Sequence, residues 1–274
     1  MGRSVGDAVA GVDMAAVSFS GGLDSSLLVA CAKKVTRVVA CTAAVEGAPD
    51  FVRARTAAAR LGVELAMTKL TAEAVRKELE DMQLPFEPTA MDASLWSLYS
   101  VVARSASERG AKVLLLGQLA DELFGGYAKY RTALAEGGEA KAEEAMRKDV
   151  DGYAARGRIR DVSACSRWLQ PRFPFEAKEV VELGLAFPLS FKISGTTTKL
   201  VLRRAATLLG VQEELTGTPK KAAQYSSGIQ KVVLGTSLFN GRQSKANHDS
   251  IAATEGEAGG FQTTPGEVQL LRPG

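Results

Sequence analysis

A strand-like run followed at once by two glycines and a helical pattern is the feature that most constrains this chain of 274 residues. Residues 15–19 form a short apolar run that predicts a buried strand. Ser20, Gly21 and Gly22 follow, and leucines recur at helical spacing from Leu23 onward. Paired glycines permit positive φ and leave no Cβ in the way of a ligand. A strand, a glycine turn and a helix N-terminus predict an anion site made of backbone N–H groups.

The same loop carries an acid, Asp24, where a bound phosphate would be repelled unless a cation lay between them. The chain lacks the GxxxxGKS/T and GxGxxG patterns of other phosphate-binding loops. Because Mg²⁺ prefers one or two carboxylates together with phosphate oxygens, we predict that Asp24 is a magnesium ligand. The segment resembles the pyrophosphate loop of the N-type ATP pyrophosphatases. The alternative interpretation is an ordinary Gly-Gly turn that enters a helix.

Length and composition predict a soluble globular protein of one large or two modest domains. The net charge of +3 gives no basic field that would indicate nucleic-acid binding. We expect no membrane span, because no apolar run is long enough, and no signal peptide, because residues 1–13 lack an apolar core. Three widely spaced cysteines without a CxxC pair argue against a zinc site, a disulfide framework and a thiolation enzyme. They predict a reducing, cytoplasmic environment.

Strand-like and helical patterns alternate over the first half of the chain. Besides 15–19, strands are expected at residues 36–43, 63–67 and 113–116, and Asp92 is expected to cap the long helix before the last of these. This alternation predicts an α/β fold with a doubly wound parallel sheet, which binds ligands at the carboxyl ends of its strands.

The second half of the chain changes in character. From Gly137 the pattern becomes mostly helical, and after residue 235 it is polar and aperiodic. We therefore predict three parts: an α/β core over 1–136, a helical subdomain over 137–235 that completes the active site, and a disordered tail over 236–274.

A second acidic segment, residues 117–127, follows the strand predicted at 113–116. It contains the pair Asp121 and Glu122. Because the carboxyl ends of parallel strands meet at one edge of a sheet, we expect Asp121 to lie near Asp24. Two carboxylates from different strand ends are what one phosphate-bound magnesium needs. The alternative interpretation is a solvated turn at a helix start.

Taken together, SGGLDSS (20–26) and ADELFGGY (120–127) resemble the synthetase domain of asparagine synthetases. Further resemblances cover Glu46–Asp50, Arg172–Glu182, Lys199–Arg203 and Pro219–Gly228. The last of these is most similar to the stand-alone, asparagine-synthetase-related branch. The resemblance extends from about Val17 to Leu234, and it implies the fold of the N-type ATP pyrophosphatases, which is of the adenine nucleotide alpha hydrolase-like kind.

The resemblance also implies an AMP-forming amide ligase. The side-chain carboxylate of aspartate would attack the α-phosphate of ATP, giving β-aspartyl-AMP and pyrophosphate, and ammonia would then displace AMP. Carried over position by position, the pyrophosphate loop comprises Ser20, Gly21, Gly22, Leu23, Asp24 and Ser25. Backbone groups of Phe19, Ala43 and Gly117 would line the nucleotide, and Asp24 and Asp121 would hold Mg²⁺. Lys220 matches the family's lysine that neutralises charge on the phosphates, and Lys221 is a second candidate. The alternative interpretation is that Lys220 is an ordinary lysine on the solvent-exposed surface.

Three departures from the family pattern bear on function. Only sixteen residues precede Val17, and residue 2 is glycine where the family's amidotransferase half begins with a nucleophilic cysteine. We therefore expect a need for free ammonia, a separate glutaminase subunit or another nucleophile. Gln118 replaces the glutamate of GEGxDE, and an amide cannot act as a base near neutral pH. Glu176–Ala177 replaces Leu-Asp and Thr218 replaces an arginine, which leaves the aspartate pocket undefined.

Three functional hypotheses follow from these observations. The first is an asparagine-forming ligase that uses ATP and Mg²⁺. The second keeps the adenylation chemistry but changes the acid or the acceptor, with Gln118 altering the second step. The third is a nucleotide-binding subunit of low turnover that pairs with a glutaminase. The acid substrate, the ammonia donor and the existence of a homodimer stay open.

Overall fold

A parallel sheet forms the centre of the computed structural model, which describes residues 1–212 and 223–236. Within these residues the sheet has five strands in the order β3-β2-β1-β4-β5. Their bounds are Met14–Ser18 (β1), Arg37–Ala44 (β2), Glu64–Lys69 (β3), Val113–Leu115 (β4) and Gln170–Arg172 (β5). In the central strand, Val17 pairs with Ala40 of β2 on one side and with Leu115 of β4 on the other. This arrangement confirms the predicted doubly wound sheet, and its topological switch point lies between β1 and β4.

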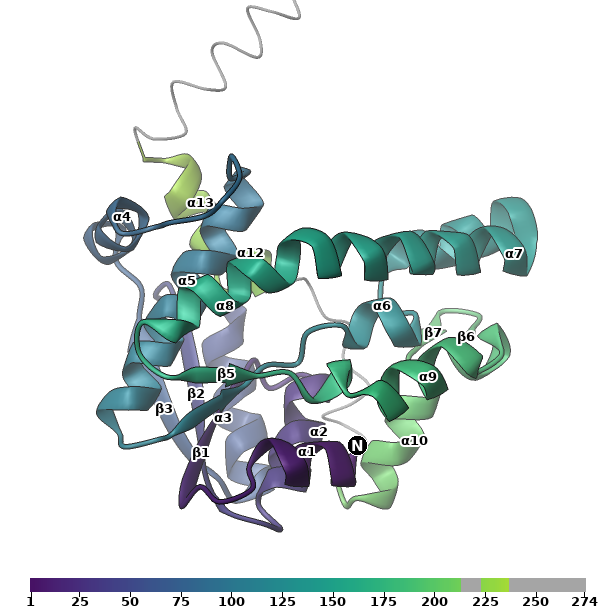
Figure 1. The fold of residues 1–274 in the computed structure, drawn as a ribbon, viewed down its shortest axis with the longest axis horizontal. Coiled ribbons are helices and arrows are strands. Elements are labelled where there is room, and N and C mark those ends of the chain that lie inside the picture. Colours follow the sequence, from purple (N-terminus) through teal and green to yellow (C-terminus); the bar gives the residue numbers. More distant parts are fainter. Residues whose placement is uncertain (213–222, 237–274) are drawn as a thin grey trace, which may run out of the picture. The chain divides into compact units, whose positions relative to one another are not determined.

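Helices cover both faces of the sheet (Figure 1). One layer contains α1 (Gly2–Ala8), α2 (Leu23–Ala32), α3 (Pro49–Leu61) and α10 (Leu200–Leu208). The other contains α4 (Ala72–Glu80), α5 (Ala90–Glu108), α8 (Arg158–Ser166) and α13 (Ile229–Leu234). Because both faces are covered, the central strands are apolar throughout, and Ala15, Ala16 and Val17 of β1 are all fully buried.

The remaining elements are short, apart from one long helix. They are α6 (Ala120–Phe124), α7 (Ala128–Gly152), a π-helical turn η1 (Tyr153–Gly157), 3₁₀ turns η2 (Pro174–Glu176) and η3 (Leu189–Phe191), α9 (Lys178–Ala186), the hairpin strands β6 (Ile193–Ser194) and β7 (Thr197–Thr198), and α12 (Ala223–Ser226). Helix α7 consists of two helical segments that meet at Gly138, where φ is 74° and ψ is −170°, and the chain reverses there, since Lys129 and Asp149 form an ion pair of 2.6 Å.

Several local expectations differ from the structure. The edge strand β5 was not expected, because it is three residues long and contains Pro171. The N-cap of α5 is Thr89, whereas Asp92, the predicted cap, is the third helical residue and completes a capping box with Thr89. The helical segment over residues 128–137 was not expected, whereas the helix predicted from 139 follows the break at Gly138, where the backbone is not helical.

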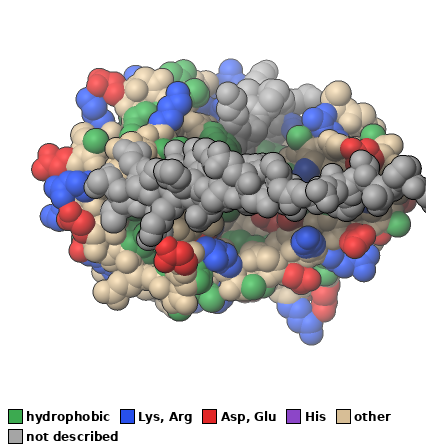
Figure 2. All heavy atoms as spheres, turned by 90° about the horizontal axis from the view of Figure 1, so that it is seen from above, with side chains coloured by type: hydrophobic (Ala, Val, Ile, Leu, Met, Phe, Trp, Pro, Cys, Tyr) green, Lys and Arg blue, Asp and Glu red, His purple; other side chains and the backbone are tan. Residues whose placement is uncertain are grey.

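The structure bears on the predicted division into three parts only within the described residues. Residues 1–234 form one compact unit, and the division at residue 136 stays a prediction. The expected tail over 236–274 lies almost wholly outside the described residues. No helix in the described ranges is both long enough and apolar enough to span a membrane. Figure 2 shows basic and acidic side chains intermixed over the described part of the face that it displays.

Candidate functional site

The glycine loop between β1 and α2 is built from backbone that only glycine can adopt easily. Gly21 has φ +69°, and a Cβ there would lie 2.6 Å from the carbonyl oxygen of Arg53. Gly22 is the N-cap of α2, and no side chain caps the helix. The first N–H groups of α2 therefore stay available to a ligand at the positive end of the helix dipole.

Asp24 and Asp121 lie on either side of one ammonium group. Asp24 is in the first turn of α2, and Asp121 is in α6, which follows β4. The Nζ atom of Lys199 lies 2.8 Å from both carboxylate oxygens of Asp24 and 2.7 Å from Oδ1 of Asp121. Gly126 permits this approach, because a Cβ there would lie 1.8 Å from Oδ1 of Asp121. The switch point thus holds two acids that converge on one cation position.

Lys199 is a site residue that we did not predict from sequence. It lies between the β6–β7 hairpin and α10, it is 5% exposed, and its φ of 56° is left-handed. Burial alone would lower the pKa of the Lys199 ammonium, but Asp121 and Asp24 outweigh that effect and raise the pKa. The only sequence signal was its place in the KxxLR segment, because its partners lie far away along the chain.

A cavity of about 420 Å³ opens beside these acids and the glycine loop. Eight of the predicted site residues line it: Phe19, Ser20, Asp24, Ser25, Ala43, Gly117, Gln118 and Asp121. Gly21, Gly22 and Leu23 belong to the loop without being among the lining residues. The volume falls in the range of small-molecule sites.

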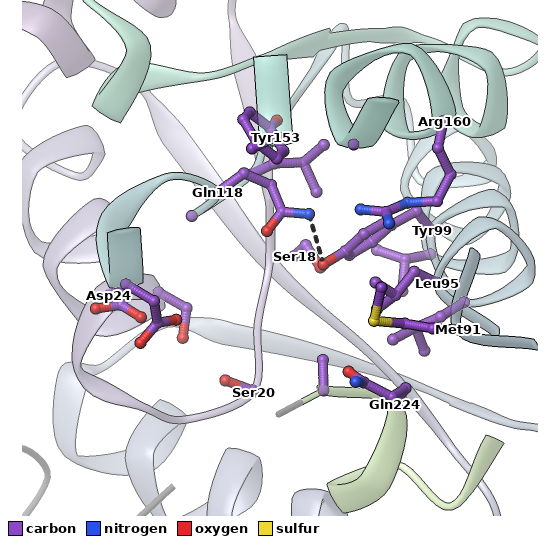
Figure 3. A pocket seen from close by; sticks show the side chains of 18 of the residues that line it. Ser18, Ser20, Asp24, Met91, Leu95, Tyr99, Gln118, Tyr153, Arg160 and Gln224 are labelled. Atoms are coloured by element: carbon purple, nitrogen blue, oxygen red, sulfur yellow. Dashed lines mark hydrogen bonds between the residues drawn. The ribbon is translucent and has the colours of Figure 1, made fainter. Parts of the chain in front are cut away.

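The cavity has a second wall that sequence patterns did not indicate. It is formed by one face of α5 and by the run from α7 through η1 to α8. Figure 3 shows Met91, Leu95, Tyr99, Tyr153 and Arg160 of this wall, and Arg156 also lines it. Asp92 holds both arginines, with 2.7 Å to Nη2 of Arg156 and 3.4 Å to Nη1 of Arg160. A π-helical turn at this place is typical of functional sites, since such turns re-aim side chains.

Gln118 and Glu122 line the cavity together with Asp121 and have different hydrogen-bond partners. The Gln118 amide donates to the hydroxyl of Tyr99 and to Asp161. Glu122 accepts a hydrogen bond of 2.7 Å from the hydroxyl of Tyr127. Burial raises the pKa of the Glu122 carboxyl, although this hydrogen bond opposes the rise.

The expected magnesium ligands fit a divalent cation in type, since two carboxylates converge beside uncapped backbone N–H groups. No group of three or more Asp, Glu, His or Cys side chains in the described residues could hold a metal by itself. Mg²⁺ would therefore need phosphate oxygens as further ligands, as expected from its preference for carboxylates together with phosphate oxygens. Lys220 and Lys221, the predicted charge-neutralising lysines, lie outside the described residues.

Fold and site together define a doubly wound α/β protein with a candidate anion site at its switch point. Comparison with known families makes this more specific: the family model for asparagine synthase matches residues 2–168 and 138–238. The chain therefore belongs to the asparagine synthase family.

Among individual relatives, a protein described as a glutamine-hydrolysing asparagine synthetase from Methanocaldococcus jannaschii is 28% identical over 271 residues, covering 84% of this chain and 49% of that protein. The glutamine-hydrolysing asparagine synthetase of Asparagus officinalis is 28% identical over 208 residues, covering 69% of this chain and 34% of that protein. The chain thus spans about half or less of the length of these relatives.

Among solved structures, a U34-tRNA thiolase from Methanococcus maripaludis aligns with 86% of this chain and 78% of its own, at 16% identity and a TM-score of 0.38. This likeness is too low to support an argument about function.

Proposed function

We propose that this chain is the synthetase part of an ATP-dependent, AMP-forming amide ligase, with aspartate as the first candidate acid. The observation that carries the proposal is the convergence of Asp24 and Asp121 on one cation position beside an uncapped helix N-terminus. Membership of the asparagine synthase family supports it.

In the first step, the N-terminal N–H groups of α2 and the hydroxyls of Ser20 and Ser25 bind the pyrophosphate part of ATP. Asp24 and Asp121 would hold Mg²⁺, which when bound neutralises charge on the phosphate oxygens. The Lys199 ammonium occupies the position between the two acids in this structure, so Mg²⁺ would bind there only once that side chain moves aside. A carboxylate oxygen of the acid attacks the α-phosphorus, the bond to the bridging oxygen breaks, and pyrophosphate leaves. Lys220 and Lys221 stay candidates for neutralising charge on the phosphates.

In the second step, an amine attacks the acyl carbon and AMP leaves. Gln118 lines the cavity where the family's glutamate would lie, so the acceptor side of the site differs from the family pattern. Glu176 is held by the hydroxyl of Tyr153 at 3.0 Å and by Arg158 at 2.7 Å, and it is not among the lining residues. These observations favour the same adenylation chemistry on another acid or acceptor as the second candidate function. A separate glutaminase, a homodimer and a cytoplasmic location stay proposals.

The adenylation step is tested by ATP–pyrophosphate exchange in the presence of MgCl₂ and a panel of acids that begins with L-aspartate. We expect acid-dependent exchange, and we expect it to fall by roughly 100-fold in Asp24→Asn and Asp121→Asn, because each removes half of the cation site. Asp151→Asn, at an exposed position of α7, is the matched control and should leave exchange unchanged. Tight ATP binding without any exchange would instead favour the low-turnover subunit.

A further inference from the structure

The side-chain amide of Gln118 is held in one orientation by partners on its nitrogen. Nε2 lies 3.2 Å from the hydroxyl oxygen of Tyr99, and it also donates to Oδ2 of Asp161. A glutamine amide has two N–H groups, so these two partners use both of them. Figure 3 shows the nitrogen turned toward Tyr99 and the oxygen turned away from it, into the cavity.

The Asp161 carboxylate accepts the Gln118 hydrogen bond through Oδ2, and its salt bridge with Arg160 favours the ionised form. Its carboxylate is fully buried, and its Oδ1 atom accepts a hydrogen bond of 2.7 Å from Nε of Arg160. Arg160 is itself 5% exposed and is anchored to Asp92. Burial raises the pKa of Asp161, and the Arg160 guanidinium works against that rise. The pair therefore presents one free acceptor oxygen to the Gln118 nitrogen.

We infer that Asp161 is a positioning residue that fixes the Gln118 amide so that its carbonyl oxygen accepts an N–H hydrogen bond from the incoming amine. This inference rests on the proposed function and describes its second step. Gln118 orients the nucleophile and takes no proton from it. The nitrogen forms a bond to the acyl carbon, the acyl C–O bond to AMP breaks, and the surplus proton passes to a phosphate oxygen of the departing AMP.

The arrangement has two consequences for the choice of nucleophile. The nucleophile must carry an N–H donor, and it must arrive as a neutral amine, because no carboxylate at position 118 is available to deprotonate an ammonium ion. Hydroxylamine, which is a far weaker base than ammonia, should therefore be the better nucleophile near pH 7.

The contact between Gln118 and Asp161 also predicts the effect of exchanging the amide and the carboxylate between these two positions. Gln118→Glu alone would place a second carboxylate against buried Asp161, and Asp161→Asn alone would leave Arg160 with only its longer ion pair to Asp92. The double variant Gln118→Glu/Asp161→Asn keeps one carboxylate and one amide in contact and turns the carboxylate toward the cavity.

The test is a double-mutant cycle that compares Gln118→Glu, Asp161→Asn and the double variant with the unmodified chain. The measured quantity is the ratio of product formed to pyrophosphate exchanged, where the product is the hydroxamate with hydroxylamine and the amide with ammonium. Exchange reports the first step alone, so the ratio isolates the second. We expect the ratio with hydroxylamine to fall about 10-fold in Asp161→Asn and in Gln118→Leu, the size of one lost hydrogen bond. In the double variant the ratio should recover, and the preference should shift toward ammonium. Asp151→Asn is the matched control.

The outcomes separate this inference from the proposed function. Absence of acid-dependent exchange in the unmodified chain would overturn the proposed function, and this inference with it. Normal exchange with an unchanged ratio in Asp161→Asn would overturn the inference alone. The same holds if the double variant shows no greater preference for ammonium than the unmodified chain.

Discussion

At the scale of single residues, Lys199 shows most clearly how strain and charge are combined in this site. A left-handed φ costs a non-glycine residue about 1 kcal/mol, so other contacts must compensate for it. Here the compensation comes from ion pairs of 2.8 Å and 2.7 Å to Asp24 and Asp121. Without that cation, the two carboxylates would face each other across a buried position.

Replacing the lysine therefore tests the cation site directly. Lys199→Met keeps most of the apolar stem and removes the charge, so we expect a lower melting temperature. Millimolar MgCl₂ without ATP should raise the melting temperature of this variant more than that of the unmodified chain, because the divalent ion can replace the ammonium. Thermal unfolding followed by circular dichroism measures both effects.

The control for this prediction is Lys141→Met, which removes an exposed lysine that pairs with Glu136 at 2.9 Å. NaCl at equal ionic strength corrects for screening. If MgCl₂ shifts the melting temperatures of Lys199→Met and the unmodified chain equally, Asp24 and Asp121 are not a divalent-cation site.

At the scale of elements, α5 forms part of the second wall of the cavity, and its N-terminus is tied to the π-helical turn η1 of the same wall. Thr89 caps the helix, and its hydroxyl and backbone N–H both contact the Asp92 carboxylate. The same carboxylate binds Arg156 of η1 at 2.7 Å. A helix cap thus also joins α5 to the π-helical turn beside it in the wall of the cavity.

The charge state of Asp92 gives this junction a pH dependence. Burial alone would raise the pKa of Asp92, but hydrogen bonds from Arg156 and Thr89 outweigh it and lower the pKa below its ordinary value of 3.8. A carboxyl with a lowered pKa in the folded state contributes stability above its unfolded pKa and loses that contribution as the pH falls through its folded pKa.

We therefore expect Asp92→Asn to reduce the free energy of unfolding by about 1–3 kcal/mol at pH 7. The difference from the unmodified chain should shrink as the pH falls below the unfolded pKa of about 4 and through the lower folded pKa of Asp92. Urea unfolding at a series of pH values measures this difference in the free energy of unfolding, with Asp151→Asn as the control. A difference of the same size at pH 3 and pH 7 would show that the carboxylate charge contributes nothing to the junction.

Sequence patterns predicted the elements that form from local signals and missed those that depend on distant partners. The strands β1 to β4 and the glycine loop were predictable, because buried parallel strands are apolar throughout and paired glycines mark the turn. Strand β5 was not predictable, because a strand that contains proline is possible only at the edge of a sheet, and the sequence does not show that residues 170–172 lie at an edge. The cap of α5 was misplaced by three residues because Thr89 and Asp92 both suit a helix start.

At the scale of the whole molecule, the parallel sheet brings together acids that are far apart in the chain. Asp24 and Asp121 follow the carboxyl ends of β1 and β4, which the structure shows to be neighbours, and their place at the ends of parallel strands was the basis for predicting that they lie close together. Lys199 and Asp161 reach the site from the second half of the chain through packing that no periodicity encodes. The first set could be predicted from sequence, and the second needed the structure.

The central claim is that a carboxylate oxygen attacks the α-phosphorus of ATP at this site. Its most direct test is to supply the chain with MgCl₂, ATP and ¹⁸O-carboxyl-labelled L-aspartate, or the acid that gives most exchange, together with hydroxylamine, and to analyse the nucleotide product by mass spectrometry. The account predicts AMP that carries one ¹⁸O atom from the acid, formed together with pyrophosphate. AMP without the label, or ADP with phosphate, would contradict it.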